Sequence, residues 1–528
     1  PSPREGEGLG VRVALALLGA VLLLALALRL YRIDTLPFGL WRDEARHGLT
    51  ALRMAADPAY RPAYVTDLRV QLPGLGLAPF AVALQLLGVY LWTMRLVTAV
   101  AGALTVLPVY ALVTRLGGRR GVGLLAALLV AISSWQITIS RFSFPTVFEP
   151  LLTWGGLWLL DRALRPGGGR AARPAAIIIG GLLAGACFGL AAQTYHIGRF
   201  APLMGGLLAL ATIIERRDWR RWLLAVLPAA LGCLLVLAPL IGYAIRQPDD
   251  FNGRVGAVFV LSEEARQGRA PLAVLDDSLR RHLLMFNVQG DLNGRHHAPG
   301  RPMLDYVTGL GFLLGLAALL RRIAGWRSMF LLAALGVGLL PSALSVDSPH
   351  GMRAFEAAPL ACAIAALGMA ELLRMLWPAG PRQRRIVAWG ASAALGLALA
   401  LNVWVYFAIM PPDPQVFLGF YPVQSQMGVY VRAAADARAG GRIYVPRAVA
   451  ADQIFAFLSA GLPVETFDGA ALSSPPRPGD HFLLSGYFAD QEAAALTPVL
   501  GPDPLAEGPG FPDGRGPTFL VYQIPMAP

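Results

Sequence analysis

The chain has 528 residues, 55% of them hydrophobic, and its mean hydropathy of +0.54 excludes a soluble globular protein. Its net charge is +12 at pH 7, and all 45 basic residues are arginine. In a soluble chain this charge would suggest nucleic acid as a partner. Here the arginines lie in short connections between apolar runs, where membrane topology accounts for them. The composition therefore predicts a polytopic α-helical membrane protein that contacts membrane lipids and binds no nucleic acid.

Eleven apolar runs approach the length of about 20 residues that a helix needs to cross a bilayer. The predicted spans are 9–28, 92–114, 121–140, 143–160, 174–195, 198–214, 222–245, 303–320, 328–346, 354–376 and 386–410. The first run ends at Arg29 without a small-residue cleavage pattern, which indicates a retained anchor. The run at 72–91 is interrupted by two prolines and two glycines, so we predict an interfacial or re-entrant segment there.

Arginine is distributed unevenly over the connections between these spans. The connections of one side carry Arg4, Arg12, Arg115, Arg119, Arg120, Arg162, Arg165, Arg170, Arg173, Arg216, Arg217, Arg220, Arg221, Arg321, Arg322, Arg327, Arg374, Arg382, Arg384 and Arg385. The short turns of the other side hold only Arg353. The positive-inside rule then predicts a protein of the inner or plasma membrane with a cytoplasmic N-terminus. The outer regions would be 29–91, 246–302 and everything after about residue 411.

The last of these regions differs in composition from the rest. Strands are predicted at 442–446, 464–468, 481–487 and 518–524, and helices at 451–461 and 490–500. We therefore expect a transmembrane domain at 1–410 followed by a small soluble α/β domain at 411–528. The second shows no nucleotide-binding glycine pattern and no paired catalytic residues, so no chemistry is predicted for it.

The stretch "GLWRDEARHGLTALRM", 39–54, places the acidic pair Asp43 and Glu44 soon after the first span. Asp43 is predicted to cap a helix, with Arg46 and His47 three and four residues later on the same face. Two interpretations stay open for this motif alone. It is either a capped, salt-bridged helix on the membrane surface or a catalytic acid pair.

A second cluster, "SRFSFPTVFEPLLTW" at 140–154, contains Glu149 at the start of an apolar run. An acid near the hydrocarbon boundary is costly, so Glu149 is predicted either to face a polar cavity or to pair with Arg141. A third, "AAQTYHIGRFAP" at 191–202, offers Tyr195, His196 and Arg199 to an anion.

The fourth cluster, "SVDSPHGMRAFEAAP" at 345–359, contributes His350 and Arg353. The fifth, "GDLNGRHHAPGRP" at 290–302, carries Arg295 and two adjacent histidines. Adjacent histidines lack the i,i+4 spacing of helical metal ligands, so no metal site is predicted here. The loop either contributes cations to a binding site or is a solvated basic loop. A divalent cation remains open as a cofactor. The three cysteines lie in apolar runs and form neither a disulfide framework nor a zinc site.

If the bundle brings these clusters together, they line a cavity with a carboxylate base and cationic clamps. Such a cavity suits transfer of a group from a lipid phosphate: the base takes a proton from a hydroxyl, and arginines neutralise the leaving phosphate. The candidate substrate-binding residues are Arg46, His47, Arg141, Tyr195, His196, Arg199, Arg295, His350 and Arg353. The alternatives are a transporter, whose sites usually lie at the bilayer midplane, and a non-catalytic subunit of a membrane complex.

The motif "LWRDEARHGLTALRM" resembles the first-loop motif of the GT-C glycosyltransferases, in particular the protein O-mannosyltransferase and aminoarabinose transferase group of glycosyltransferase family 39. The order of elements over 9–410 is similar as well: "QLPGLGLAPF", then "TMRLVTAVAGALTVLPVYALVTRLGGRR", then "VFEP". Leu72, where aminoarabinose transferases have lysine, and Glu149, where they have Asp, argue against that sugar and against lipid A.

This resemblance implies an inverting transferase of the cell envelope. The donor would be a polyprenyl-phosphate-linked hexose or pentose, and the acceptor a lipid, glycan or protein hydroxyl on the outer face. Asp43 would be the general base, Glu44 the second acid of the pair, and Glu149 a further acid lining the site.

Overall fold

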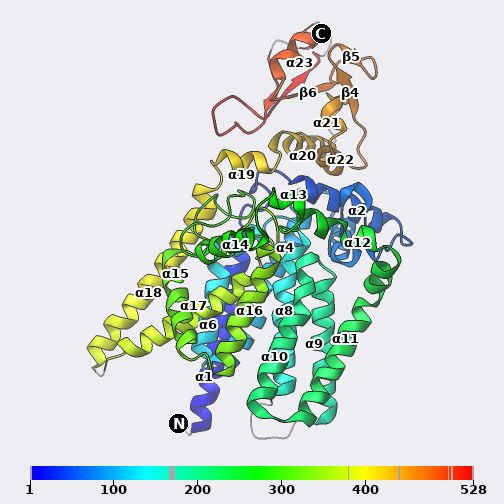
Figure 1. Cartoon of the computed structure of the whole chain (residues 1–528). Helices are drawn as coiled ribbons and strands as arrows, with labels where there is room; N and C mark the ends of the chain where they lie inside the picture. Colours follow the sequence, from blue (N-terminus) through cyan, green and yellow to red (C-terminus); the bar gives the residue numbers. More distant parts are fainter. Residues whose placement is uncertain are drawn as a thin grey trace.

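A computed structural model describes residues 3–165, 173–378, 380–437, 440–497, 499–500 and 503–525 (Figure 1). Arg170, one of the arginines predicted to lie inside, falls outside the described residues. The molecule is a bundle of long helices that carries a small sheet domain at one end (Figure 1).

Helices occupy all eleven predicted spans. They are α1 (Pro3–Leu30), α4 (Thr93–Leu104) with α5 (Val106–Gly117), α6 (Arg120–Ile132) with α7 (Ser134–Ser140), α8 (Phe148–Leu164), α9 (Pro174–Ala192), α10 (Ala201–Arg216), α11 (Trp219–Arg246), α15 (Tyr306–Arg321), α16 (Trp326–Ala343), α17 (Ala357–Leu376) and α18 (Pro381–Trp404) with the π-helical turn η5 (Val405–Ile409). Within the described residues, eight are long and apolar enough to cross a membrane, or nine with α6 and α7, which meet at a 56° bend. The helices α8 and α15 are shorter, with 17 and 16 residues. The predicted polytopic helical class is confirmed.

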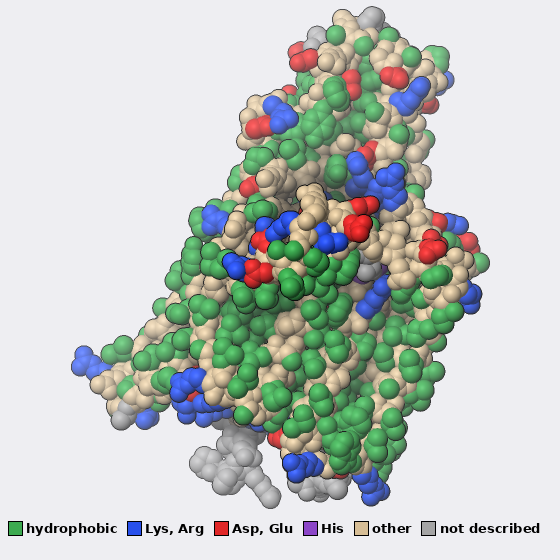
Figure 2. Space-filling view, in the orientation of Figure 1, with side chains coloured by type: hydrophobic (Ala, Val, Ile, Leu, Met, Phe, Trp, Pro, Cys, Tyr) green, Lys and Arg blue, Asp and Glu red, His purple; other side chains and the backbone are tan. Residues whose placement is uncertain are grey.

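Hydrophobic side chains cover the outside of the bundle in a broad band, and charged side chains gather at its two ends and on the sheet domain (Figure 2). The helix α11 illustrates the band, since Leu227, Leu231, Leu234 and Leu235 are all exposed on it. Exposed leucines of this density are expected of a surface that faces lipid.

The interrupted run at 72–91 folds into a 3-10 turn, η2 (Gly74–Leu77), and the helix α3 (Ala78–Leu87), which ends at Gly88 with φ 79°. Together they span 14 residues, too few to cross a bilayer. At the same end of the bundle lie α2 (Arg42–Ala56), α12 (Pro248–Val258), α13 (Glu263–Arg266) and α14 (Pro271–Met285) (Figure 1). Short pieces complete this layer: β1 (Tyr64–Val65), η1 (Asp67–Arg69), β2 (Leu72–Pro73), η3 (Pro145–Val147) and η4 (His196–Phe200).

The sheet domain contains all four predicted strands, as β3 (Ile443–Pro446), β4 (Glu465–Asp468), β6 (His481–Ser485) and β8 (Phe519–Gln523). Two short strands, β5 (Ala471–Leu472) and β7 (Ala506–Glu507), complete the order β5-β4-β3-β6-β8-β7, in which β3 runs parallel to β4 and β6. Its helices are α19 (Pro414–Gly419), α20 (Pro422–Asp436), α21 (Arg447–Ala450), α22 (Gln453–Leu458) and α23 (Ala489–Leu496). The helix α20 was not predicted, although its buried Val423, Met427 and Val431 recur every four residues.

Candidate functional site

The acidic pair lies in the first turn of α2, but the helix begins two residues earlier than predicted. Trp41 is the N-cap residue, and its backbone N–H donates to Glu44 Oε2 at 2.8 Å. A glutamate at the third helical position reaches back to the cap in this way in a capping box. The predicted N-cap Asp43 is therefore wrong, because Glu44 satisfies the cap and leaves Asp43 to other contacts.

Glu44 is fully buried and binds a second segment of the chain. Its Oε1 accepts hydrogen bonds from the backbone N–H of Ser143 at 2.7 Å and from Ser143 Oγ at 2.6 Å. Ser143 lies between α7 and α8, so this carboxylate fixes the start of α2 against the transmembrane bundle. Glu44 has the contacts of a positioning residue.

The variant Glu44→Ala is expected to lower the free energy of unfolding by about 3 kcal/mol, because it leaves two backbone N–H groups and one hydroxyl without their acceptor. Unfolding of the purified protein in mixed micelles measures this loss. Glu263→Ala, which removes an exposed acid from the first turn of α13, is the matched control and should change little. Equal losses in the two variants would contradict the role of Glu44.

Asp43 remains partly open to solvent, with 27% of its side chain exposed. Its Oδ1 accepts a hydrogen bond from Arg46 Nη1 at 2.9 Å. No hydrogen bond from any described residue reaches Oδ2. The helix thus presents one free carboxylate oxygen while an ion pair orients the other.

An aromatic row connects α2 to two of the other predicted clusters. The rings of Trp41 and Phe144 stack with centroids 5.3 Å apart, Phe144 meets Tyr195 at 5.0 Å, and Tyr195 meets His196 at 5.0 Å. His47 packs on Phe144 at 4.9 Å, and burial lowers its pKa to about 4, so this ring is neutral at pH 7. Phe144 was not among the predicted residues, although it lies inside the "SRFSFP" motif.

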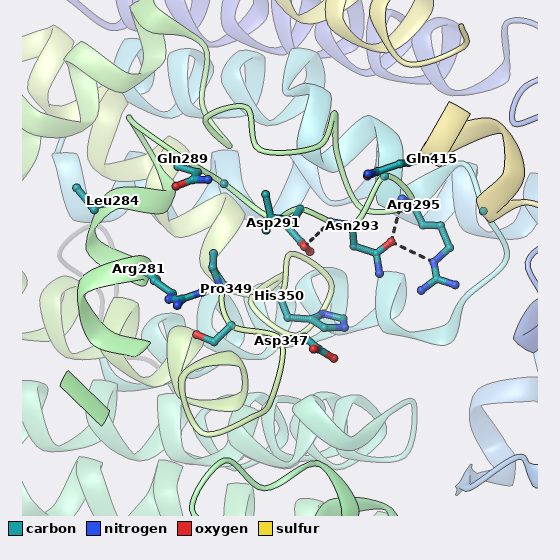
Figure 3. A pocket seen from close by; sticks show the side chains of 15 residues that line it. Arg281, Leu284, Gln289, Asp291, Asn293, Arg295, Asp347, Pro349, His350 and Gln415 are labelled. Atoms are coloured by element: carbon teal, nitrogen blue, oxygen red, sulfur yellow. Dashed lines mark hydrogen bonds between the residues drawn. The ribbon is translucent and has the colours of Figure 1, made fainter. Parts of the chain in front are cut away.

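Arg295 joins this row to a cavity of about 600 Å³ (Figure 3). Its guanidinium carbon lies 4.3 Å from the Trp41 ring centroid, and its Nε donates to Asn293 Oδ1 at 3.2 Å. Burial lowers the pKa of Arg295, and the nearby carboxylate of Asp43 acts in the opposite direction. The walls come from α14, the segment 289–295, the turn 347–350 and α19; the lining residues are Arg281, Leu284, Gln289, Gly290, Asp291, Leu292, Asn293, Gly294, Arg295, Asp347, Ser348, Pro349, His350, Gln415 and Gly419.

The loop at 290–302 is not the solvated basic loop that its sequence suggested, because Asp291, His296 and His297 are buried. Asp291 Oδ2 accepts from His296 Nδ1 and from the N–H of Gly351, both at 2.6 Å. The rings of His296 and His350 lie 4.4 Å apart, and the donor atoms of Asp291, His296 and His350 all fall within 4.8 Å of one another. The Nε2 of His296 is buried and has no partner among the described residues. One carboxylate and two imidazoles form a donor set that suits zinc and similar ions.

Glu149 is buried, and it does not form the ion pair with Arg141 that was one of its two predicted environments. It accepts hydrogen bonds from the N–H of Gly198 at 3.1 Å, Thr146 Oγ1 at 3.2 Å and Thr194 Oγ1 at 3.4 Å. Two of these donors belong to the turn that carries Tyr195 and His196. The contacts of Glu149 are therefore those of an anchor for that turn.

Arg141 is fully buried and engaged with other parts of the backbone. Its guanidinium donates to Tyr406 Oη and to the carbonyl oxygens of Leu28, Arg29, Tyr31 and Leu36. The four carbonyl oxygens belong to the end of α1 and to the chain that follows it. The Arg141 guanidinium therefore stabilises the fold and has its donors in use.

The remaining predicted residues lie around the site without lining the cavity. His196 Nε2 meets the carbonyl oxygen of Gln71 at 2.6 Å, and the Arg199 guanidinium lies 4.0 Å from the Phe251 ring centroid. Arg353 Nη1 donates to the carbonyl of Val346 at 2.9 Å. Among the predicted residues that the structure describes, Arg295 and His350 are the two that line the cavity.

Residues 19–248 match the family model described as dolichyl-phosphate-mannose-protein mannosyltransferase. A search of curated proteins finds no match. The chain is similar in structure to ArnT from Cupriavidus metallidurans bound to undecaprenyl phosphate, with a TM-score of 0.51, 15% identity and 97% of each chain covered. It is also similar to the archaeal oligosaccharyltransferase AglB from Archaeoglobus fulgidus in complex with an inhibitory peptide and a dolichol-phosphate. There the TM-score is 0.53 and the identity 14%, over 84% of this chain and 63% of that chain.

These comparisons agree with the element order and with the motifs that first suggested the resemblance. The matched family segment contains α2, the aromatic row and Glu149. The structural similarity extends beyond it, through the sheet domain. The chain therefore shares the fold of ArnT and AglB, and residues 19–248 match the mannosyltransferase family model.

Proposed function

We propose that the chain is an inverting glycosyltransferase that moves a hexose or pentose from a polyprenyl-phosphate-linked donor to a hydroxyl of a lipid, glycan or protein. The observation that carries this proposal is the free Oδ2 of Asp43 on a helix whose Trp41 packs against Arg295, an arginine of the 600 Å³ cavity. The family segment and a structural neighbour bound to undecaprenyl phosphate support a lipid-phosphate donor.

In the proposed reaction Asp43 Oδ2 takes the proton of the acceptor hydroxyl, and the acceptor oxygen attacks the anomeric carbon of the donor sugar. The bond from that carbon to the phosphate oxygen breaks, and the polyprenyl phosphate leaves with the electron pair. Arg295 neutralises the charge that develops on the phosphate. A single displacement of this kind inverts the anomeric configuration.

In this proposal the other two predicted acids position parts of the site and do not take part in the proton transfer. Glu44 holds the start of α2, and Glu149 holds the turn with Tyr195 and His196. The uneven distribution of arginines supports a cytoplasmic N-terminus, with the site and residues 411–528 on the outer face. On that side the sugar reaches the acceptor while the polyprenyl tail stays in the bilayer.

A divalent cation, when bound, would sit at Asp291, His296 and His350, whose donor atoms all lie within 4.8 Å of one another. It would supply further positive charge beside the cavity. The proposed proton transfer does not depend on it.

Zinc is expected to raise the thermal unfolding temperature of the purified chain, because an ion that binds only the folded state at 100 times its Kd stabilises that state by about 2.7 kcal/mol. The same shift is expected in Asp43→Asn and should vanish in His296→Ala combined with His350→Ala. A matched control, His481→Ala in the sheet domain, should keep it. If zinc no longer raised the unfolding temperature of Asp43→Asn but still raised that of the double variant, the cation would bind at α2 instead.

The proposed function is tested with purified protein in lipid nanodiscs. Polyprenyl-phosphate hexoses and pentoses are supplied with lipid, glycan and peptide acceptors, and both products are quantified. We expect one polyprenyl phosphate for each glycosylated acceptor, with inverted anomeric configuration. Retained configuration would contradict the single displacement. Solute transport without sugar transfer, or activity that requires a stoichiometric partner subunit, would favour the alternative functions.

A further inference from the structure

The sheet domain sits directly on α2, more than 350 residues away in the sequence. Just before the helix, the N–H of Leu40 donates to Ser425 Oγ at 2.9 Å, and the Gln426 side chain donates to the carbonyl oxygen of Phe38. The rings of Phe38 and Phe417 lie 5.0 Å apart. The chain leading into the acidic pair is therefore fixed by α19 and α20.

The two arginines that flank Asp43 are both held by the same domain. Arg42 Nη2 pairs with Asp452 Oδ2 at 3.1 Å. Arg46 Nε donates to Gln453 Oε1 at 2.8 Å. Asp452 and Gln453 form the start of α22, so this helix end contacts the arginines on both sides of Asp43.

Close packing supports a fixed contact between α2 and α22. A Cβ added to Gly48, inside α2, would lie 2.5 Å from the Phe457 ring. Phe457 is buried against the main hydrophobic core. Glycine inside a helix costs about 1 kcal/mol relative to alanine, so its presence at this position is explained by the space that Phe457 needs.

We propose that the sheet domain orients the base, with Gln453 as a positioning residue that acts through Arg46. The contacts form an unbroken line: Gln453 Oε1 to Arg46 Nε at 2.8 Å, then Arg46 Nη1 to Asp43 Oδ1 at 2.9 Å. Because two N–H groups of one planar guanidinium are used, the position of the amide determines where the carboxylate can be held. This inference rests on the proposed function, in which Asp43 is the base.

The test compares Gln453→Ala with Gln453→Glu in the full-length protein. In the alanine variant Arg46 loses its Nε partner and can leave Asp43, so kcat should fall about 10-fold while the donor KM stays within about twofold. Glutamate keeps an oxygen acceptor for Arg46 and should restore kcat. Gln491→Ala, on the exposed face of α23, is the matched control.

An unchanged kcat in Gln453→Ala would overturn the proposal. So would an equal loss in the alanine and glutamate variants with a lowered unfolding temperature, since that pattern belongs to a purely structural role. Hydrogen exchange of the α2 amides at residues 42–48 separates this failure from failure of the proposed function. Faster exchange in Gln453→Ala is expected even in a chain that transfers no sugar, and unchanged exchange would refute the contact itself.

Discussion

Asp43→Asn is expected to reduce the rate of sugar transfer about 1,000-fold and to leave donor affinity unchanged. The amide has nearly the same shape and its oxygen can still accept from Arg46, but it cannot take a proton from the acceptor. Transfer rates and donor dissociation constants of the two proteins, measured side by side, test both halves of this expectation.

The matched control is Asp57→Asn, which changes an exposed acid at the other end of α2. It should retain full activity. Equal rates for the native chain and Asp43→Asn would remove Asp43 from the mechanism. A large rise in donor Kd with an unchanged maximal rate would make it a binding residue instead.

Arg295→Ala is expected to lower kcat/KM for the donor about 100-fold, since it removes the cavity-lining cation that also packs on Trp41 at the start of α2. Loss of one preorganised donor to a developing oxyanion typically costs about 100- to 1,000-fold. Arg295→Lys should lie between the native protein and the alanine variant, because lysine keeps the charge and loses the planar stacking on Trp41.

Arg301→Ala is the control for position in the same loop, since its guanidinium faces Trp404 at 5.6 Å. It should change kcat/KM little. If Arg301→Ala impaired transfer as strongly as Arg295→Ala, the loss would reflect damage to the loop rather than loss of a phosphate contact.

The elements that the sequence predicted correctly are those with local signals. Apolar runs of sufficient length gave the helices, and short β-branched and aromatic runs bounded by glycine and proline gave β3, β4, β6 and β8. The interruption of 72–91 by proline and glycine correctly separated α3 from the spanning helices. In each case neighbouring residues carry the information, so no distant contact is needed.

The distribution of roles within the site could not be predicted in the same way. Asp43 and Glu44 are neighbours in the sequence, and the burial of Glu44 depends on its contact with Ser143, 99 residues away. The metal-type cluster draws His350 from a different segment than Asp291 and His296. The packing of α22 on α2 has one local signal in the sequence, the glycine at position 48, which is unfavourable inside a helix. Long-range contacts decided each of these features.

The central claim is tested most directly by a structure of the protein with polyprenyl phosphate bound. We expect the phosphate in the cavity lined by Asp291, Arg295 and His350, within hydrogen-bonding distance of the Arg295 guanidinium. A second arginine-lined cavity, of about 530 Å³, lies at the other end of the helices between Arg119, Arg322, Arg327 and Arg374. Phosphate bound there, with none beside Arg295, would contradict the proposed site of transfer.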